Sequence, residues 1–359
     1  MDKVRYGVIG TGMMGVEHIH NIVATGRGVV TAVSDTESSS LDMARQALVG
    51  QPTPQLFADH RALLDAGVCD AVVIATPNMT HRAVLDDVLV APVHVLVEKP
   101  LCTTTSDCQS IVEATEQRTE MVWVGLEYRY MPAVSRLATE VRSGAVGEVH
   151  MVAIREHRFP FLPKVGDWNR FTANTGGTLV EKCCHFFDLM NLLTQATPTR
   201  VYASGGQSVN HLDETYNGKT SDILDNAFVV VDFDSGARGM LDLCMFAEAT
   251  HNQEEISVVG DQGKVEALIP ESVLRIGRRG EHDIGAVEHS VVSDATVAHE
   301  GLHHGSSYIE HQRFIDAIVN GTEPEVTVRD GLMAVAVGEA AHLSIDRGAP
   351  VDLSEIVGS

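Results

Sequence analysis

The chain has 359 residues, 44% of them hydrophobic, which is enough for two domains that each bury a core. With 49 acidic against 26 basic residues, the formal net charge is −23, so partners such as nucleic acid or an anionic membrane surface are not expected. The N-terminus lacks the layout of a signal peptide, no apolar run is long enough to span a membrane, and six cysteines are scattered without a metal-like pair. These features predict a cytoplasmic protein.

The first motif along the chain is a glycine-rich turn. An apolar run over residues 4–9 leads into Gly-x-Gly-x-x-Gly at Gly10, Gly12 and Gly15, and a helical pattern follows. Gly10 lets the chain turn sharply, Gly12 lets the backbone approach a pyrophosphate, and Gly15 lets the helix pack close to the strand. The start of the helix offers free N–H groups to the phosphates. The motif therefore predicts dinucleotide binding.

An acidic residue after the second apolar run selects the cofactor. Asp35 follows the run over residues 29–33, where a carboxylate accepts hydrogen bonds from the adenosine ribose and repels a 2′-phosphate. Thr36 and Glu37 come next, and neither neutralises a phosphate. NAD is therefore predicted in preference to NADP, with dual use open to a cation from elsewhere in the chain.

Strand and helix patterns alternate through the first part of the chain. Expected strands cover residues 4–9, 29–33, 71–75, 94–97 and 122–125. Expected helices cover residues 12–24, 38–48, 60–64, 81–90 and 106–118. This alternation predicts an α/β fold, with a doubly wound parallel sheet of the Rossmann type in which ligands bind past the carboxyl ends of the strands.

Three turns are predicted at those carboxyl ends. They are the glycine loop, the turn at Thr76-Pro77-Asn78, and the turn at Glu98-Lys99-Pro100. The predicted cofactor-binding residues are Gly10, Thr11, Gly12, Met13, Met14, Asp35, Thr76, Pro77, Asn78, His81, Glu98 and Lys99.

The pattern changes after residue 130. Long runs typical of strands cover residues 149–157, 200–204, 227–233, 237–247, 255–259 and 265–268. Expected helices cover residues 133–142, 177–193, 304–320 and 330–346. Successive strands without crossover helices predict an α+β domain with a large, mostly antiparallel open sheet. The expected domains are residues 1–128, for the dinucleotide, and 129–359, for substrate and oligomerisation, with a C-terminal segment able to pack back on the first.

One predicted helix carries three ionisable residues. Glu181, His185 and Asp188 are spaced i, i+4 and i+7, which puts them on one face of the helix expected over 177–193. A solvated face with an ordinary ion pair is the alternative. Together with Lys99 at a strand end, the triplet favours a hydride-transfer site.

Such a site needs a base and a group that stabilises negative charge, because the cofactor itself accepts the hydride. His185 is the predicted base, since the pKa of histidine suits work near neutral pH. Lys99 can stabilise the reacting oxygen, and Glu181 can orient the histidine or hold a substrate hydroxyl. The predicted catalytic residues are Lys99, His185 and Glu181. Asp188 can fix the histidine tautomer or pair with a neighbouring helix, and this choice stays open.

These motifs resemble those of the glucose–fructose oxidoreductase / inositol dehydrogenase / MocA family. The likeness rests on Gly10-Thr-Gly12-Met-Met-Gly15, Glu98-Lys99-Pro100 and Gly176-Gly177…Glu181…His185…Asp188, with related segments at 124–130 and 167–170, and covers nearly the whole chain. It implies a tightly bound nicotinamide cofactor, sugars or cyclitols as substrates, and dimers or tetramers formed through the open sheet. The catalytic lysine and histidine of the family map to Lys99 and His185. Glu181 replaces the usual aspartate, and Cys183 a usual small residue.

Three further residues are predicted to contact substrate, besides Lys99, Glu181 and His185. Arg129 can bind a substrate oxygen or form an inter-domain salt bridge, Trp168 can stack on a sugar or be buried in a loop, and His304 precedes a helix that can close the pocket. The histidines show no compact set of metal ligands, so no metal is predicted.

The leading functional hypothesis is NAD-dependent oxidation of a secondary alcohol of a sugar or an inositol-like cyclitol to the ketone. Two alternatives share the fold. One is a glycosidase or epimerase that recycles its NAD within each turnover, and the other is a non-catalytic, NAD-sensing co-repressor.

Overall fold

The computed structural model describes residues 3–280 and 282–358, so the outer ends of the two predicted domains lie outside the described residues. The chain divides into two compact units. The first unit comprises Met1–Tyr130 and Ala295–Leu332, and the second comprises Met131–Asp294 and Met333–Ser359. Each unit therefore contains two separate stretches of the chain.

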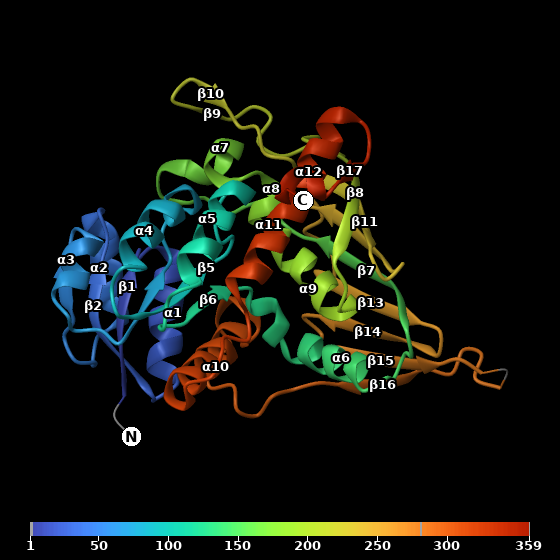
Figure 1. Cartoon of the computed structure of the whole chain (residues 1–359), viewed down its shortest axis with the longest axis horizontal. Coiled ribbons are helices and arrows are strands. Elements are labelled where there is room, and N and C mark those ends of the chain that lie inside the picture. Colours follow the sequence, from blue (N-terminus) through green and yellow to red (C-terminus); the bar gives the residue numbers. More distant parts are fainter. Residues whose placement is uncertain (1–2, 281, 359) are drawn as a thin grey trace. The chain divides into compact units, whose positions relative to one another are not determined.

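The first unit is built on a six-stranded, all-parallel sheet in the order β3-β2-β1-β4-β5-β6 (Figure 1). The strands are β1 (Val4–Ile9), β2 (Gly28–Ser34), β3 (Gln55–Phe57), β4 (Ala71–Ile74), β5 (His94–Glu98) and β6 (Val122–Gly125). The helices are α1 (Met13–Ala24), α2 (Ser38–Ala47), α3 (His60–Asp65), α4 (His81–Val88), α5 (Thr105–Thr115) and α10 (Ser306–Asn320). The strand order reverses between β1 and β4, the position where ligands bind in such sheets. The predicted doubly wound sheet is confirmed.

Strands buried on both faces were visible in the sequence because they are continuous apolar runs. All four residues of β4 and of β6 are buried. The edge strand β3 was missed, since it has three residues and none of them is fully buried. A strand this short at a sheet edge carries no periodicity that a sequence can reveal.

The helix α10 completes the hydrophobic core of the first unit. Phe314 is fully buried, with its ring centroid 6.0 Å from that of Trp123 on β6 and 6.2 Å from that of Tyr6 on β1. The helix also packs against α1 and against the 3₁₀ turn η2 (Glu127–Tyr130). Late residues of the chain thus cover the sheet formed by early ones.

The second unit contains a nine-stranded sheet in the order β16-β15-β14-β13-β7-β12-β11-β8-β17. Its strands are β7 (Val149–His157), β8 (Pro198–Gly206), β11 (Asn226–Phe233), β12 (Arg238–Cys244), β13 (Glu254–Gly260), β14 (Gly263–Ile269), β15 (Val273–Arg278), β16 (Glu288–Val291) and β17 (Val351–Asp352). The pair β7–β12 is parallel and the other pairs are antiparallel. This confirms the large, mostly antiparallel sheet.

Helices cover one face of this sheet. They include α6 (Pro132–Arg142), which packs on β14 and β15, and α9 (Cys184–Thr194), which packs on β7 (Figure 1). The long α11 (Val328–Arg347) adds a hydrogen bond from the Ala203 amide on β8 to Ser344 Oγ, 2.9 Å. The same unit also contains the short helices α7 (Thr172–Thr175), α8 (Thr178–Glu181) and α12 (Ser354–Val357) and a hairpin of β9 (Thr215–Tyr216) and β10 (Lys219–Thr220).

The strands missed in the second unit are short or polar. All residues of β16 are exposed, and β15 and β17 alternate without a clear apolar run.

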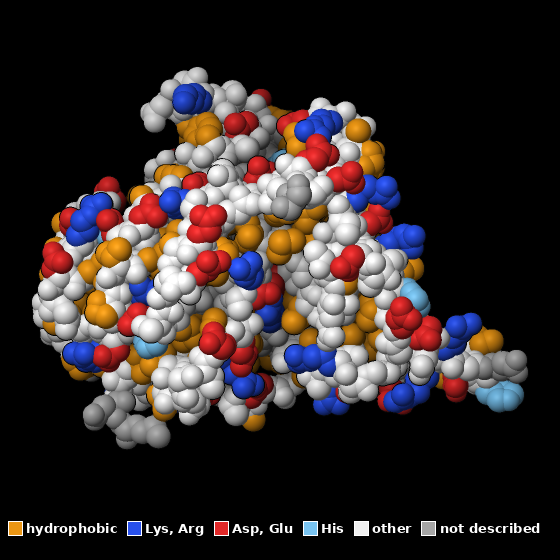
Figure 2. All heavy atoms as spheres, viewed as in Figure 1, with side chains coloured by type: hydrophobic (Ala, Val, Ile, Leu, Met, Phe, Trp, Pro, Cys, Tyr) orange, Lys and Arg blue, Asp and Glu red, His pale blue; other side chains and the backbone are white. Residues whose placement is uncertain are grey.

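No helix in the described part of the chain is long and apolar enough to cross a bilayer. On the face shown in Figure 2, basic side chains are interspersed with acidic ones and form no continuous basic surface.

Candidate functional site

The glycine loop joins β1 to α1 at the carboxyl edge of the parallel sheet. Gly10 has φ of +87°, and a Cβ there would lie 2.7 Å from the backbone of Ala75. A Cβ on Gly15 would lie 2.0 Å from the Gly10 carbonyl oxygen. A Cβ on Gly12 would meet no atom within 4 Å, so the space beside it is open. The first amides of α1 therefore face a space that a phosphate can enter.

Asp35 fastens this loop to the end of β2. Its Oδ2 accepts a hydrogen bond of 2.7 Å from the Thr11 amide and one of 3.3 Å from the Thr11 hydroxyl, and its Oδ1 accepts one of 2.8 Å from the Glu37 amide. The carboxylate is half-buried, with Thr36 and Glu37 exposed beside it. Asp35 thus shapes the loop and also keeps negative charge next to it.

The turn after β4 is held by His81. Its Nδ1 lies 2.8 Å from the Pro100 carbonyl oxygen and its Nε2 lies 3.0 Å from that of Thr76, and burial lowers the pKa of the ring. Both ring nitrogens therefore contact protein backbone. His81 therefore ties the Thr76-Pro77-Asn78 turn to the Glu98-Lys99-Pro100 turn, and its contact with the cofactor stays a prediction.

Glu98 is the last residue of β5, and Lys99 follows it at the carboxyl edge of the sheet. Glu98 is buried, its Oε2 accepts a 3.1 Å hydrogen bond from the Lys99 amide, and its Oε1 lies 2.9 Å from His18 Nε2 on α1. His18 Nδ1 lies 2.9 Å from His311 Nε2 on α10. Burial opposes ionisation of Glu98, but the hydrogen bond and charge of His18 lower its pKa below the usual range. Lys99 itself is half-buried.

The sequence contains a signal for His18 but none for His311. His18 lies three positions after Gly15, on the helix that follows the glycine loop, and this signal was available but missed. Nothing in the spacing indicates that His311 joins it. Burial, and then the neighbouring charge of His18, lowers the pKa of His311 well below its usual value.

A second buried carboxylate lies on η2. Glu127 pairs with His303, 2.9 Å from Oε1 to Nδ1, and accepts a hydrogen bond from Ser307. Although burial opposes ionisation, His303 and Ser307 lower the pKa of Glu127 to about 2. Glu310 accepts a 3.2 Å bond from Trp123 Nε1, and burial, followed by the charges of Glu127 and Glu98, raises its pKa well above the usual range.

Besides Lys99, two of the predicted substrate contacts lie in this unit. Arg129 forms an ion pair of 3.1 Å with Asp330 and donates to the Glu325 carbonyl oxygen at 3.0 Å. Both partners lie in the first unit, so this ion pair is not the inter-domain salt bridge considered as the alternative. His304 is exposed and has φ of +55°, immediately before Gly305 caps α10.

In the second unit, the predicted helix over 177–193 is interrupted, and the prediction of one continuous helix was wrong. Helix α8 ends at Glu181 and α9 begins at Cys184. Cys183 has ψ of −6°, and the Phe186 amide bonds to the Cys183 carbonyl three residues back, which is the tighter 3₁₀ pattern.

A buried ion pair accompanies this break. Lys182 Nζ lies 3.0 Å from Glu156 Oε1 on β7, and both side chains are almost fully buried. Burial lowers the pKa of Lys182, while Glu156 acts in the opposite direction. The Lys182 side chain therefore lies against the sheet and not on a solvent-facing side of a helix.

The three ionisable residues of this segment are all buried. Glu181 is 5% exposed, His185 2% and Asp188 1%, which excludes the solvated face considered as the alternative. Gly177 directly precedes α8 and has φ of +87°. A Cβ at this position would lie 2.3 Å from His342 Nε2. Trp168 is half-buried in the 3₁₀ turn η3 (Val165–Arg170).

The first unit combines a parallel sheet with an open glycine loop, an acidic residue after β2 and a lysine after β5. Together these features define a dinucleotide-binding oxidoreductase. Residues 4–126 match the family model described as "Oxidoreductase family, NAD-binding Rossmann fold", and residues 139–353 match "Oxidoreductase family, C-terminal alpha/beta domain". The chain belongs to this GFO/IDH/MocA family of oxidoreductases, as the sequence motifs indicated.

Known relatives span nearly the whole chain. Myo-inositol 2-dehydrogenase of Thermotoga maritima is 27% identical, over 99% of this chain and 100% of the relative. The scyllo-inositol 2-dehydrogenase (NAD(+)) of Bacillus subtilis is 25% identical, over 98% and 96%. Among solved structures, an oxidoreductase domain protein from Kribbella flavida has a TM-score of 0.87 at 20% identity, covering 98% of this chain and 100% of that one.

Proposed function

We propose that the protein oxidises a secondary alcohol of a cyclitol or sugar to the ketone, with NAD as the hydride acceptor. The proposal is supported by the names of the relatives from Thermotoga maritima and Bacillus subtilis, which are inositol 2-dehydrogenases and match almost end to end. It is carried by one observation: Lys99 follows β5 at the sheet edge that also bears the open glycine loop, and its neighbour Glu98 is anchored by His18.

The residues of the first unit fit the cofactor. Gly12 leaves space for the pyrophosphate beside the first amides of α1, and Asp35 offers a carboxylate to the ribose hydroxyls. Because the Asp35 carboxylate also repels a 2′-phosphate, we propose that NAD is preferred to NADP. When bound, the nicotinamide supplies hydride-transfer chemistry.

The protein groups supply proton transfer and charge stabilisation. In the proposal, the Lys99 ammonium donates a hydrogen bond to the reacting oxygen and stabilises its growing negative charge. His185 removes the hydroxyl proton, and buried Glu181 orients the imidazole or holds a neighbouring substrate hydroxyl. Trp168 and His304 remain proposed substrate contacts. Arg129 becomes a positioning residue, since Asp330 and Glu325 already engage its guanidinium.

The exposed face of the second sheet is the proposed contact between copies of this chain. Met151, Tyr202, Phe228, Val230 and Met240 are large apolar residues exposed on neighbouring strands. An apolar surface of this kind marks an interface more often than a solvated surface. We propose a homodimer or homotetramer.

To test this, the purified protein is mixed with each compound of a panel of cyclitols and sugars and with either NAD or NADP. The absorbance of the reduced nicotinamide reports the reaction. The expected result is steady reduction of NAD with an inositol or a pyranose sugar. Conversion of substrate without accumulation of reduced cofactor indicates instead an enzyme that recycles its NAD. Cofactor binding without conversion of any compound indicates a sensor.

A further inference from the structure

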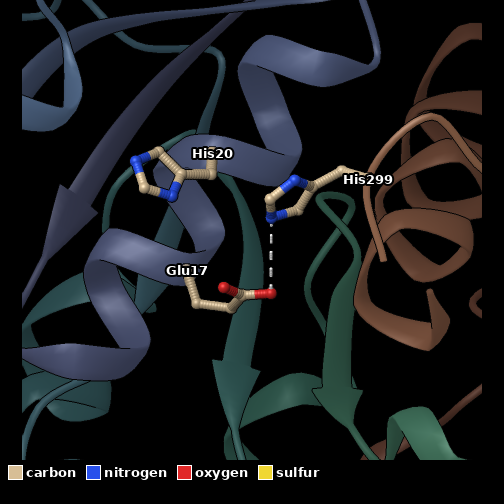
Figure 3. Close-up of side chains that lie close together, drawn as sticks. All are labelled: Glu17, His20 and His299. Atoms are coloured by element: carbon tan, nitrogen blue, oxygen red, sulfur yellow. Dashed lines mark ion pairs between the residues drawn. The ribbon is translucent and has the colours of Figure 1, made fainter. Parts of the chain in front are cut away.

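Three metal-ligating side chains meet in the first unit, outside the proposed catalytic site. Glu17 and His20 lie on the same side of α1, and His299 lies in the segment that leads to the 3₁₀ turn η4 (Gly301–His303). One potential ligand atom from each residue lies within 4.8 Å of the others. Figure 3 shows the His299 imidazole pointing toward the Glu17 carboxylate, with the His20 side chain beside them on the same helix as Glu17. The group lies beyond the first turn of α1.

The carboxylate of Glu17 is fixed and buried. The residue is 6% exposed, and its Oε1 accepts hydrogen bonds of 3.1 Å from Asn21 Nδ2 and 3.2 Å from the Leu302 amide. Its ion-pair partner among the described residues is His299, whose Nε2 is 3.8 Å away. That nitrogen is buried and has no hydrogen-bond partner within the part of the chain that the structure describes. A buried anion therefore faces a ring nitrogen whose hydrogen-bonding capacity is unused.

We infer that Glu17, His20 and His299 bind a divalent transition-metal ion of the Zn²⁺ class. Zinc binds imidazole nitrogen at about 2.0–2.1 Å and carboxylate oxygen at about 2.0–2.2 Å, so two ligands of one ion lie at most about 4 Å apart. The Glu17–His299 distance of 3.8 Å already meets this limit. His20 is exposed on α1 and can turn inward to complete the set.

The donor types select the metal. Two imidazoles and one carboxylate suit zinc, whereas magnesium and calcium prefer sites made of oxygen atoms. A fourth position is left for water. The bound ion joins α1 to the segment around His299, which enters the first unit late in the chain. The sequence prediction of no compact ligand set missed this cluster, because only folding brings His299 to α1.

The direct test is calorimetric titration of Zn²⁺ into the full-length, tag-free, NAD-loaded protein after removal of metals with a chelator. We expect one ion per chain with a Kd on the order of micromolar or tighter. His20→Ala and His299→Ala should each weaken binding by about tenfold or more, because each removes one of three ligands. His150→Ala, at an exposed histidine of the second unit, is the matched control and should bind as the wild type does.

A second measurement does not depend on heat of binding. Zn²⁺ should raise the Tm of the wild-type protein and of His150→Ala, and this rise should be lost in His20→Ala and His299→Ala. His20 is exposed, so its replacement leaves the fold intact. Absence of saturable binding below about millimolar Zn²⁺, equal binding in the wild type and His20→Ala, or an equal loss in His150→Ala would each overturn the inference.

Discussion

Lys99 is the residue on which the proposed chemistry depends most directly. Its backbone is held through Glu98 by His18 and His311, so the lysine follows a strand end that three buried side chains fix in place. A charge that stabilises a developing oxyanion works best when its position is set before the reaction begins.

Replacing Lys99 with Met should lower kcat by about 10²–10⁴-fold while leaving NAD affinity within a few-fold, because Met keeps the bulk and removes the ammonium. The measurements are steady-state rates with the best substrate of the panel and a fluorescence titration with the reduced cofactor. Lys219→Met, at an exposed lysine of the second unit, is the control. Wild-type turnover in Lys99→Met would contradict the assigned role.

Asp35 should decide between the two nicotinamide cofactors. Asp35→Asn keeps an oxygen that can accept from Thr11 and removes the charge, so the ratio of kcat/KM for NADP to that for NAD should rise by about tenfold or more. Glu37→Gln removes a neighbouring exposed charge and should change this ratio less. An unchanged ratio in Asp35→Asn would show that another group selects the cofactor.

At the scale of elements, strands β7 and β13 place two carboxylates directly opposite each other. Glu156 and Glu254 are cross-strand partners, and like charges in this position repel. Lys182 lies 3.0 Å from Glu156, while Glu254 Oε2 is buried without a hydrogen-bond partner among the described residues. Burial, and then the charge of Glu156, raises the pKa of Glu254 to about 7.

This shift predicts the sign of a stability effect. A carboxyl whose folded pKa lies above its unfolded value favours the folded state at low pH, and that contribution is lost as the pH rises from 4.5 through about 7. Glu254→Gln should therefore be more stable than the wild type at pH values above 7, by roughly 1–3 kcal/mol, with a smaller difference in mild acid.

Urea unfolding at an alkaline and a mildly acidic pH measures this difference. Glu248→Gln, at an exposed glutamate of the same unit, should leave the dependence on pH unchanged. If Glu254→Gln and the wild type lose stability in parallel as the pH rises, Glu254 does not carry a raised pKa.

The elements differ in how far the sequence predicts them. The bounds of β1, β6 and β7 were predicted to the residue, because their apolar runs or alternation end at clear polar or glycine signals. The break between α8 and α9 was not predicted; it contains Lys182, whose buried partner Glu156 lies on a distant strand and is not apparent from the sequence. The residues of the glycine loop follow from local spacing, whereas the Glu98–His18–His311 arrangement is created only by tertiary packing.

At the scale of the whole molecule, the uncovered face of the nine-stranded sheet predicts assembly. Phe228 is 62% exposed, and Val230 lies between Tyr202 and Met240 on adjacent strands. Burying such side chains in a second copy contributes about 25 cal/mol for each Å² of apolar surface.

Phe228→Asp should therefore shift the protein from an oligomer to a monomer, as measured by light scattering after size-exclusion chromatography. Val90→Asp places the same charge on an exposed apolar residue of the first unit and should leave the mass unchanged. A monomeric wild type, or an oligomer that withstands Phe228→Asp, would place the interface elsewhere or exclude it.

The two-part composition of the first unit also constrains biogenesis. Tyr6, His18 and Trp123 are translated well before their packing partners Phe314, His311 and Glu310. Domains ordinarily fold one after another as the chain leaves the ribosome. The interior of the nascent sheet therefore stays incomplete until the segment around Glu310, 187 residues after Trp123, has also been synthesised.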